Sequence, residues 1–392
     1  MIMNNNASRI KYLDGLRGFA AIIVMLCHII TAFYPHLYSV YPPALDDQTP
    51  LVKIIDSTPM RIFYQGNFAL MLFFVISGYV ITWNYFNRRD ENYITSSAFR
   101  RYFRLTIPAL FACVIAYLIL KFDLFFNIEA ASLTNSSLIP SWLMVPYRFD
   151  ADFIEMIKFA LYGQYFNFHS ETSYIIILWA GHALLLGPFL IYSFLAIFGQ
   201  LSKRWILYVI LVILFYNSLL LAFILGMIIC DLDVNNVLQK INKIIIVLIL
   251  FASIYFGSFT STDFEFYKPL YSDFINSHFQ LDLLYFYNTI GAALLIFAIS
   301  RTPFLMNALA TKIPLYLGKI SFPIFLLHSV IICSLSCYLF TVFVDYCSYF
   351  MSFFFVSVIT IILTIIVSHI FYNYIEVNSI KLSKSLYNFI SR

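Results

Sequence analysis

Long apolar blocks separated by short polar segments run along the whole chain. An α-helix needs about 20 predominantly apolar residues to cross the ~30 Å hydrocarbon layer of a bilayer, and most of the blocks approach this length. The clearest apolar blocks are 18–33, 67–83, 105–120, 174–198, 244–259, 283–299, 315–343 and 353–372. The pattern predicts an all-α integral membrane protein.

One further apolar block, 205–230, has an ambiguous length. Its 26 residues are long for one tilted helix and short for a hairpin, whose two arms would have about 12 residues each. Basic residues concentrate on cytosolic loops, so their distribution distinguishes the two cases. A single crossing divides the 24 basic residues 11 to 13, whereas a hairpin leaves six on the far side: Lys53, Arg61, Lys121, Arg148, Lys158 and Lys268. We therefore expect a bundle of about ten transmembrane helices with both termini cytosolic.

Composition narrows the class of protein further. Hydrophobic residues make up 61% of the 392 residues, against roughly 45–50% in soluble domains, which excludes an ordinary soluble enzyme. The net charge of +4 is spread along the chain without a basic stripe, so nothing supports nucleic-acid binding. No small-residue cleavage site follows the first apolar block, so we interpret it as a retained span rather than a signal peptide.

The chain shows no boundary at which it would divide into separate domains. We expect a single transmembrane domain over 1–392 without an appended soluble domain. Its longest polar segment is a far-side loop at 121–173, which could cap or gate a site. Histidines and carboxylates do not cluster at the spacing of metal ligands, so no metal site is predicted.

The first apolar block carries the clearest candidate chemistry. Arg17 and His28 are 11 residues apart, which is three helical turns plus about 20°, so both lie on one face and are ~16 Å apart along the helix axis. Asp14 precedes Arg17 by three residues and can pair with it. A histidine near mid-membrane normally faces protein or a water-filled cavity, and burial favours the neutral imidazole that a general base requires. The alternative is a histidine that only forms hydrogen bonds between helices.

This arrangement resembles the first-span motif of the membrane-bound acyltransferase family 3, in which an arginine or lysine and a histidine enclose ten residues. Further motifs resemble the family in the same order: FFVISGY at 73–79, FRRYFRL at 99–105, LGKISF at 317–322 and YIE at 374–376. The resemblance covers nearly the whole chain. It implies a ten-span protein that moves acyl groups, commonly acetyl from acetyl-CoA, onto hydroxyl groups of glycans or secondary metabolites.

The resemblance implies catalytic roles for residues of the first motif. His28 would remove the proton of an acceptor hydroxyl. Arg17, oriented by Asp14, would hold the phosphates of the donor or stabilise developing charge. The family also has a tryptophan and a glutamate before a middle span. We assign the glutamate to Glu171, which would orient the acceptor, with His182 as the alternative because it follows the tryptophan of WAGH.

Residues of the other motifs would bind the CoA donor. Planar guanidinium groups match phosphate oxygens, and the basic loop supplies three of them, although such residues can also serve only as topology anchors. Small residues of the second motif would give a helix a thin side for an acyl-pantetheine chain or for another helix. Two residues of the ninth predicted span could line a cavity opposite His28. The alternative is that the histidine of this ninth span only forms a hydrogen bond between helices. These candidates are Arg100, Arg101, Arg104, Ser77, Gly78, Ser321 and His328.

The sequence therefore predicts an integral-membrane O-acyltransferase that uses cytosolic acyl-CoA, with acetyl-CoA as the expected form. Its partners would be the lipid bilayer and a hydroxyl-bearing glycan, glycolipid or small metabolite. The host membrane would be a bacterial inner membrane or a eukaryotic endomembrane. A transporter or flippase without acyl-transfer chemistry is the alternative, because buried ionisable residues also mark transport pathways. A third reading is a degenerate family member that acts as a sensor or scaffold. The acceptor, the acyl length and the oligomeric state do not follow from the sequence.

Overall fold

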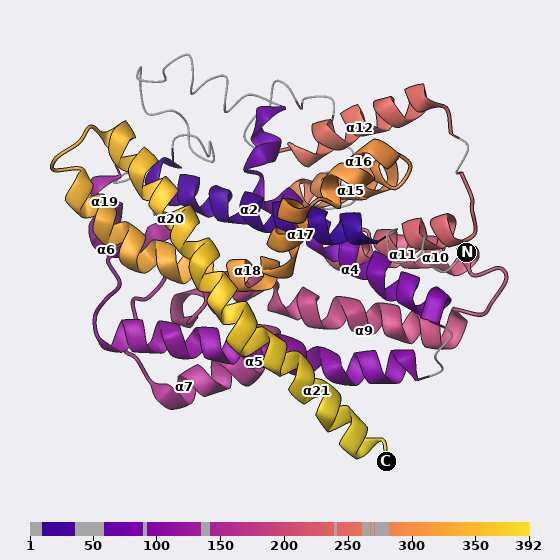
Figure 1. Ribbon diagram of the computed structural model, residues 1–392, viewed down its shortest axis with the longest axis horizontal. Helices are drawn as coiled ribbons and strands as arrows, with labels where there is room; N and C mark the ends of the chain where they lie inside the picture. The colour runs from indigo at the N-terminus through magenta and orange to yellow at the C-terminus, as the bar shows by residue number, and fades with distance from the viewer. Residues whose placement is uncertain are drawn as a thin grey trace. The chain divides into compact units, whose positions relative to one another are not determined.

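The computed structural model describes residues 10–35, 59–88, 92–134, 142–238, 241–260, 267, 270 and 282–392. Within these ranges the regular structure is helical and no strand occurs (Figure 1), which confirms the all-α prediction. Six helical segments are long and apolar enough to cross a membrane: Lys11–Phe33, Gly66–Asn87, Tyr93–Lys121, Ile176–Phe198, Ser321–Phe343 and Tyr349–Ile390. The chain is therefore a multi-pass membrane protein.

The ambiguous block at 205–230 consists of two helices. Helix α10 spans Trp205–Phe215, and α11 spans Leu220–Val234. The two are separated by a turn in which the Ser218 hydroxyl accepts a hydrogen bond from the Leu220 N–H, 3.2 Å away. The block is therefore divided into two helices, as the charge distribution favours, and the second extends past Cys230. Two membrane crossings by this block stay a prediction.

The chain folds into two compact units, and each is described by itself. The first comprises residues 1–24, 39–98 and 186–318. At its centre, α4 (Gly66–Arg88) packs against α11 and against α15 (Leu283–Ile299), which in turn packs against α12 (Lys243–Gly257). A 103° bend separates α15 from α16 (Pro303–Leu309), and α17 (Lys312–Lys319) follows.

Two glycines allow the backbones of α4 and α11 to approach closely. A Cβ on Gly78 of α4 would overlap the carbonyl oxygen of Phe223, and a Cβ on Gly226 of α11 would overlap that of Val75. Small residues at such crossings let membrane helices gain van der Waals contact along their whole length. Gly78 is thereby explained by helix packing, which is one of the two roles expected for it.

The close crossing makes a direct prediction about stability. We expect Gly226→Ala to destabilise the protein by about 1–3 kcal/mol, because overpacking against rigid backbone forces the helices apart. Gly163→Ala is the matched control, since the nearest atom to its Cβ would be at an ordinary 3.4 Å. Thermal unfolding of the detergent-purified variants measures the difference. Equal melting temperatures for the two variants would show that the crossing is not tight.

The second unit comprises residues 25–38, 99–185 and 319–392. Helix α18 (Ser321–Ile331) continues through a π-helical turn into α19 (Cys337–Phe343), and both pack against α20 (Tyr349–Phe371). Figure 1 shows α20 and α21 (Val377–Ile390), in yellow, as one long helix. Its 42 residues correspond to roughly 63 Å at 1.5 Å per residue, about twice the thickness of the hydrocarbon layer.

This unit also contains the end of α2 (Lys11–Phe33), α5 (Tyr93–Lys121) from Phe99 onward, the start of α9 (Gly181–Phe198) and the long loop between α5 and α9. The loop predicted at 121–173 is ordered into short helices, with α6 (Asn127–Leu133) and α7 (Phe153–Lys158) the longest α-helical pieces described. Residues 135–141 of this predicted loop lie outside the described part of the chain.

Candidate functional site

Two histidines that are 300 residues apart in the sequence face one another in the second unit. His28, half-buried on α2 (Lys11–Phe33), places its Nδ1 atom 3.0 Å from Nε2 of His328 on α18. The His328 side chain is completely buried, and its Nδ1 atom lies 2.8 Å from the carbonyl oxygen of Ile324. His328 therefore forms the interhelical hydrogen bond that the sequence analysis gave as one alternative, and its role in lining a cavity opposite His28 stays a prediction.

The hydrogen bonds fix which ring nitrogens carry protons. The Ile324 carbonyl can only accept, so Nδ1 of His328 carries a proton. A neutral ring is favoured by burial and carries a single N–H, so Nε2 of His328 is unprotonated and accepts a hydrogen bond. With both rings neutral, His28 donates from Nδ1, so its Nε2 is the nitrogen that carries no proton. This is the nitrogen with which a neutral histidine can accept a proton from another molecule.

A tryptophan from the long loop between α5 and α9 completes this cluster. The ring of Trp142 lies with its centre 5.1 Å from that of His28, at an interplanar angle of 37°. Asn127 holds the turn in place, because its side-chain amide donates to the carbonyl oxygens of Leu143, 2.8 Å away, and Pro146, 2.9 Å away. An aromatic face at this distance can stabilise a positive charge on the imidazole. The sequence analysis predicted that this loop could cap or gate a site but assigned no role to Trp142 itself.

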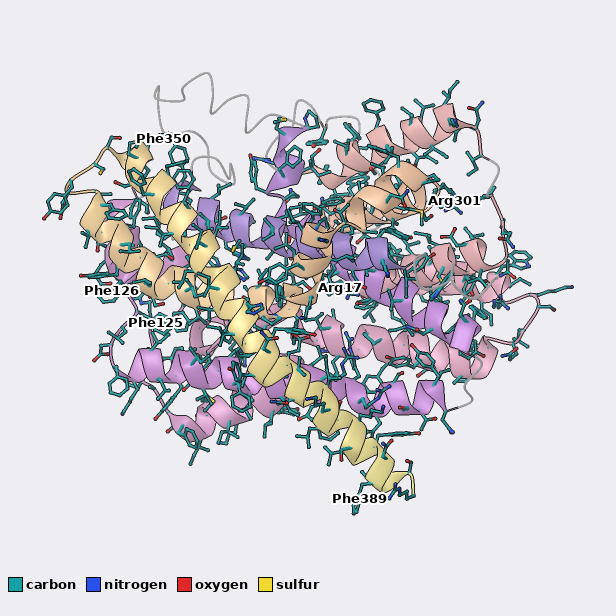
Figure 2. All side chains as sticks on the ribbon, in the orientation of Figure 1. Arg17, Phe125, Phe126, Arg301, Phe350 and Phe389 are labelled. Atoms are coloured by element: carbon teal, nitrogen blue, oxygen red, sulfur yellow. The ribbon has the colours of Figure 1, made fainter. Side chains whose placement is uncertain are left out.

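The end of this turn has a strained backbone. Tyr147 has φ 61°, a left-handed conformation that costs a bulky residue of order 1–3 kcal/mol. Its ring stacks on Phe125, labelled in Figure 2, and its hydroxyl donates to the carbonyl oxygen of Tyr174, 3.1 Å away. Burial raises the pKa of the Tyr147 hydroxyl well above its usual value, so the hydroxyl remains a donor. These contacts hold the strained turn that carries Trp142.

The charged residues of the first motif pair as predicted. Nη1 of Arg17 lies 3.1 Å from Oδ1 of Asp14, and both side chains are partly exposed. A Cβ on Gly18 would overlap the backbone at Leu317 and Gly318, so the glycine lets the start of α2 approach α17 closely. The motif therefore combines an oriented guanidinium, labelled in Figure 2, with a close helix contact.

Arg101, one of the three arginines predicted to bind CoA phosphates, makes a structural contact. Its Nε and Nη2 atoms donate to the carbonyl oxygen of Leu184, at 3.2 and 2.8 Å. In a helix this carbonyl would accept from the N–H four residues later, which here is Pro188 and has no N–H. The guanidinium replaces the missing donor. Arg100 is half-buried and Arg104 exposed on α5, and their role in binding CoA stays a prediction.

The contact between Arg101 and the Leu184 carbonyl predicts different effects for substitutions of Arg101 and Arg104. We expect Arg101→Ala to lower the free energy of unfolding by about 1–3 kcal/mol, because a partly buried carbonyl loses its donors. Arg104→Ala, at an exposed position on the same helix, should change it by no more than about 0.5 kcal/mol. Thermal unfolding of the two purified variants tests this. An unaltered melting temperature for Arg101→Ala would contradict the structural role.

Other predicted site residues lie outside the histidine cluster or at its edge. Ser77 is half-buried on α4, and Ser321 is buried at the start of α18, on the same helix as His328. Glu171 is exposed in a 3-10 turn at Ser170–Thr172. The Nδ1 atom of His182 lies 2.8 Å from the carbonyl oxygen of Tyr165. Which of Glu171 and His182 fills the middle-motif role stays a prediction, as do the roles of the two serines.

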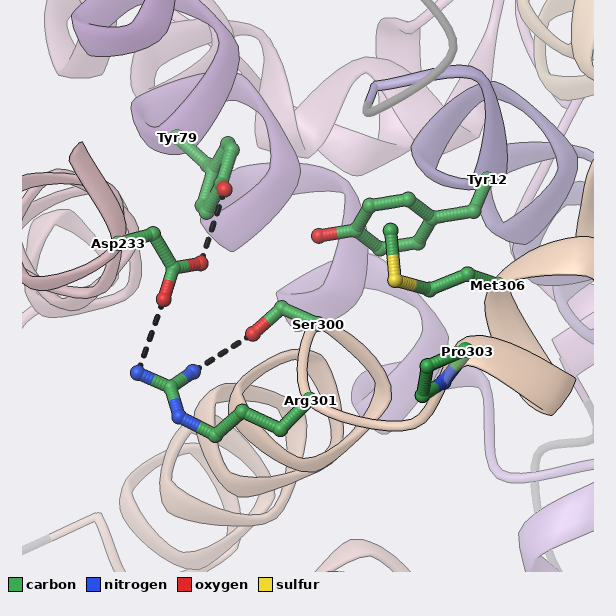
Figure 3. A pocket seen from close by; sticks show the side chains of 7 residues that line it. All are labelled: Tyr12, Tyr79, Asp233, Ser300, Arg301, Pro303 and Met306. Carbon is green, nitrogen blue, oxygen red and sulfur yellow. Dashed lines mark hydrogen bonds and ion pairs between the residues drawn. The ribbon is translucent and has the colours of Figure 1, made fainter. Parts of the chain in front are cut away.

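The first unit contains a polar cavity that sequence reasoning missed (Figure 3). An ion pair with a 2.8 Å separation joins Arg301, after α15, to Asp233, near the end of α11, and both side chains are less than a tenth exposed. The Tyr79 hydroxyl donates to the second oxygen of Asp233, 2.9 Å away. A signal was present, since Asp233 closely follows the apolar block at 205–230, but Arg301 entered the sequence analysis only as one of the basic residues assigned to the cytosolic side.

Comparison with known proteins identifies one match. Residues 10–373, nearly the whole chain, match a family model described as an acyltransferase domain. No curated protein and no solved structure matches the chain.

Proposed function

Because the chain belongs to acyltransferase family 3 and is therefore an acyltransferase, we propose that it is an integral-membrane O-acyltransferase. It would move an acyl group, with acetyl as the expected one, from cytosolic acyl-CoA to a hydroxyl of a carbohydrate or another cell-envelope or secondary metabolite. The observation that carries this proposal is the histidine pair, in which a 3.0 Å contact with His328 leaves Nε2 of His28 able to accept a proton.

In the proposed reaction, Nε2 of His28 takes the proton of the acceptor hydroxyl. The oxygen forms a bond to the carbonyl carbon of the thioester, and the carbon–sulfur bond breaks as the tetrahedral intermediate collapses. The sulfur leaves as a thiolate and receives the proton from His28, so the products are an ester and a free thiol. Such proton transfer contributes typically 10²–10⁴-fold to a rate.

His328 and Trp142 would support the base without touching the reacting atoms. When His28 becomes positively charged, its Nδ1–H bond to Nε2 of His328 becomes charge-assisted and stronger. The face of Trp142, 5.1 Å away, would add a cation–π attraction. Both interactions favour the charged form of His28 that exists only during the reaction, which is the condition for catalysis.

Charged side chains would bind and orient the two substrates. We propose that Arg17, held by Asp14 on the same helix as His28, binds donor phosphates or stabilises developing charge. Arg100 and Arg104, at the start of α5, would add cations for the phosphates. Ser77 and Ser321 would contact the pantetheine chain. Glu171 would orient the acceptor from the far side.

The proposed topology has ten crossings and cytosolic termini. Within the described ranges, four helices of 11 to 17 residues lie outside the six long segments, namely α10, α11, α12 and α15. Helix α10 has 11 residues, about 16 Å, so its crossing would require a thinned bilayer or an extended end. Both compact units would belong to one acyltransferase domain over 1–392.

An assay of the purified protein in lipid nanodiscs tests the proposed function. Acetyl-CoA labelled in its acetyl group is supplied with glycan and lipid extracts, and mass spectrometry identifies any molecule that gains an acetyl mass. Thioester consumption coupled to an acetylated product supports the O-acyltransferase. Binding of an acceptor without consumption of acetyl-CoA would support the transporter or flippase instead.

A further inference from the structure

The polar cavity of the first unit has a volume of about 190 Å³. It is lined by side chains of α2, α4, α11, α16 and the turn after α15 (Figure 3): Tyr12, Tyr79, Asp233, Ser300, Arg301, Pro303 and Met306. This volume exceeds the ~30 Å³ share of one water molecule severalfold and lies below the roughly 300 Å³ at which pockets for drug-sized ligands begin. The cavity therefore suits a ring-sized fragment of a larger ligand.

The arginine in this cavity has no capacity left for a phosphate. Its Nη2 atom faces Asp233 and the carbonyl of Val237, its Nη1 atom donates to Ser300 and to the carbonyl of Phe297, and its Nε atom donates to the carbonyl of Leu238. A guanidinium has five N–H donors, and these contacts use all five. The Asp233 carboxylate balances the charge, so the cavity favours a neutral group over an anion.

The remaining hydrogen-bonding capacity lies on two residues. The Tyr12 hydroxyl is buried, makes no hydrogen bond of ordinary geometry within the described part of the chain, and points into the cavity toward Tyr79 and Asp233 (Figure 3). The Asp233 carboxylate accepts from Arg301 and Tyr79 and has further lone pairs. A matching ligand presents an N–H donor to the carboxylate and an acceptor to the tyrosine hydroxyl.

The other walls of the cavity are flat or apolar. The Tyr12 ring, the Met306 thioether and the Pro303 ring supply them. A planar heteroaromatic ring with adjacent donor and acceptor groups matches both kinds of wall. Adenine has such an edge, with an amino donor beside a ring-nitrogen acceptor, and it is the heteroaromatic ring of the CoA donor.

We propose that this cavity binds the adenine ring of the acyl-CoA donor, an assignment that rests on the function proposed above. The phosphates of the donor would then bind cations elsewhere, because Arg301 is fully engaged. In the proposed topology, the start of α2 and the end of α15 are both cytosolic, which places the cavity on the side from which CoA arrives.

Shortened donors combined with a minimal substitution test the assignment. Tyr12→Phe removes only the hydroxyl, and Tyr349→Phe is the control, since it removes a buried hydroxyl that bonds to the Phe33 carbonyl in the other unit. We expect Tyr12→Phe to lower kcat/KM for acetyl-CoA about tenfold, the effect of one lost hydrogen bond. Its kcat/KM for acetyl-pantetheine, which lacks the nucleotide, should stay within about twofold of wild type, and Tyr349→Phe should treat both donors alike. Equal losses for both donors in Tyr12→Phe would overturn the assignment.

A competition experiment tests recognition of the adenine ring itself. Adenosine 3′,5′-bisphosphate is expected to inhibit transfer about tenfold more strongly than purine riboside 3′,5′-bisphosphate, which lacks the amino donor for Asp233, and Tyr12→Phe should weaken inhibition by the adenosine compound about tenfold. Equal inhibition by the two nucleotides would contradict an adenine site.

The assignment can also be tested separately from the proposed function. If wild type consumes neither thioester, the proposed function is contradicted, and equilibrium dialysis with labelled adenosine 3′,5′-bisphosphate decides the role of the cavity. Binding that weakens about tenfold in Tyr12→Phe would support the adenine site. Equal affinity of wild type and variant, or no binding at all, would overturn it.

Discussion

Replacing His28 with glutamine is expected to lower acyl transfer to an acceptor hydroxyl by about 10²–10⁴-fold. Glutamine is close to histidine in size, and its amide N–H can still donate to Nε2 of His328, which lies 3.0 Å from Nδ1 of the native ring. It has no nitrogen that can accept a proton at neutral pH. The substitution therefore removes the base while retaining the helix contact. The initial rate of labelled acetyl transfer at matched membrane abundance measures the loss.

A second histidine provides the control for this substitution. His369 on α20 is exposed, its Nε2 atom lies 3.0 Å from the amide nitrogen of Asn373, and it has no proposed role in the reaction. We expect His369→Gln to transfer acyl groups within about twofold of wild type. A fully active His28→Gln enzyme would contradict the proposed mechanism.

Replacing His328 with phenylalanine should have the second-largest effect. Phenylalanine retains a buried ring but provides no acceptor for Nδ1 of His28, so the tautomer with a bare Nε2 is no longer favoured. A wrong histidine tautomer costs about 10⁴-fold in serine proteases. We expect a loss of about 10²-fold or more in kcat. KM for the donor should change little, because His328 is completely buried behind His28.

A conservative variant distinguishes this positioning role from a role in packing. The side-chain oxygen of His328→Gln can accept from His28 while its amide donates to the Ile324 carbonyl, so we expect it to recover part of the activity that His328→Phe loses. Initial rates over a range of donor concentrations separate kcat from KM. Equal losses in the two variants, or an effect confined to KM, would count against the positioning role.

The sequence was informative where the physical rule is local. The length of apolar blocks predicted α2, α4, α5 and α20, and helical spacing predicted the Asp14–Arg17 ion pair. Charge asymmetry favoured two helices within 205–230, and α10 and α11 occupy that block. Each of these inferences depends on residues within a single segment of the chain or on their side of the membrane.

The sequence was less informative where contacts join distant segments. His328, which forms a hydrogen bond with His28, lies 300 residues away in the sequence. Spacing within each helix could not predict which ring nitrogens form that bond. Trp142 reaches the histidines through a turn held by Asn127, and no local pattern encodes that contact. Arg101 could have been interpreted from Pro188, which leaves the Leu184 carbonyl without a donor, but the identity of the replacement donor depends on the fold.

The protonation state of His28 in the resting protein is the most direct test of the account. Nitrogen-15 NMR of histidine-labelled protein in lipid, with the His28 signals assigned by comparison with His28→Gln, reports which ring nitrogen carries the proton before any acceptor is known. The account predicts a protonated Nδ1 and a bare Nε2 in wild type, and a mixture of the two tautomers in His328→Phe. A His28 ring that is protonated at Nε2 in the wild-type protein, or one whose tautomer is unaffected by His328→Phe, would contradict it.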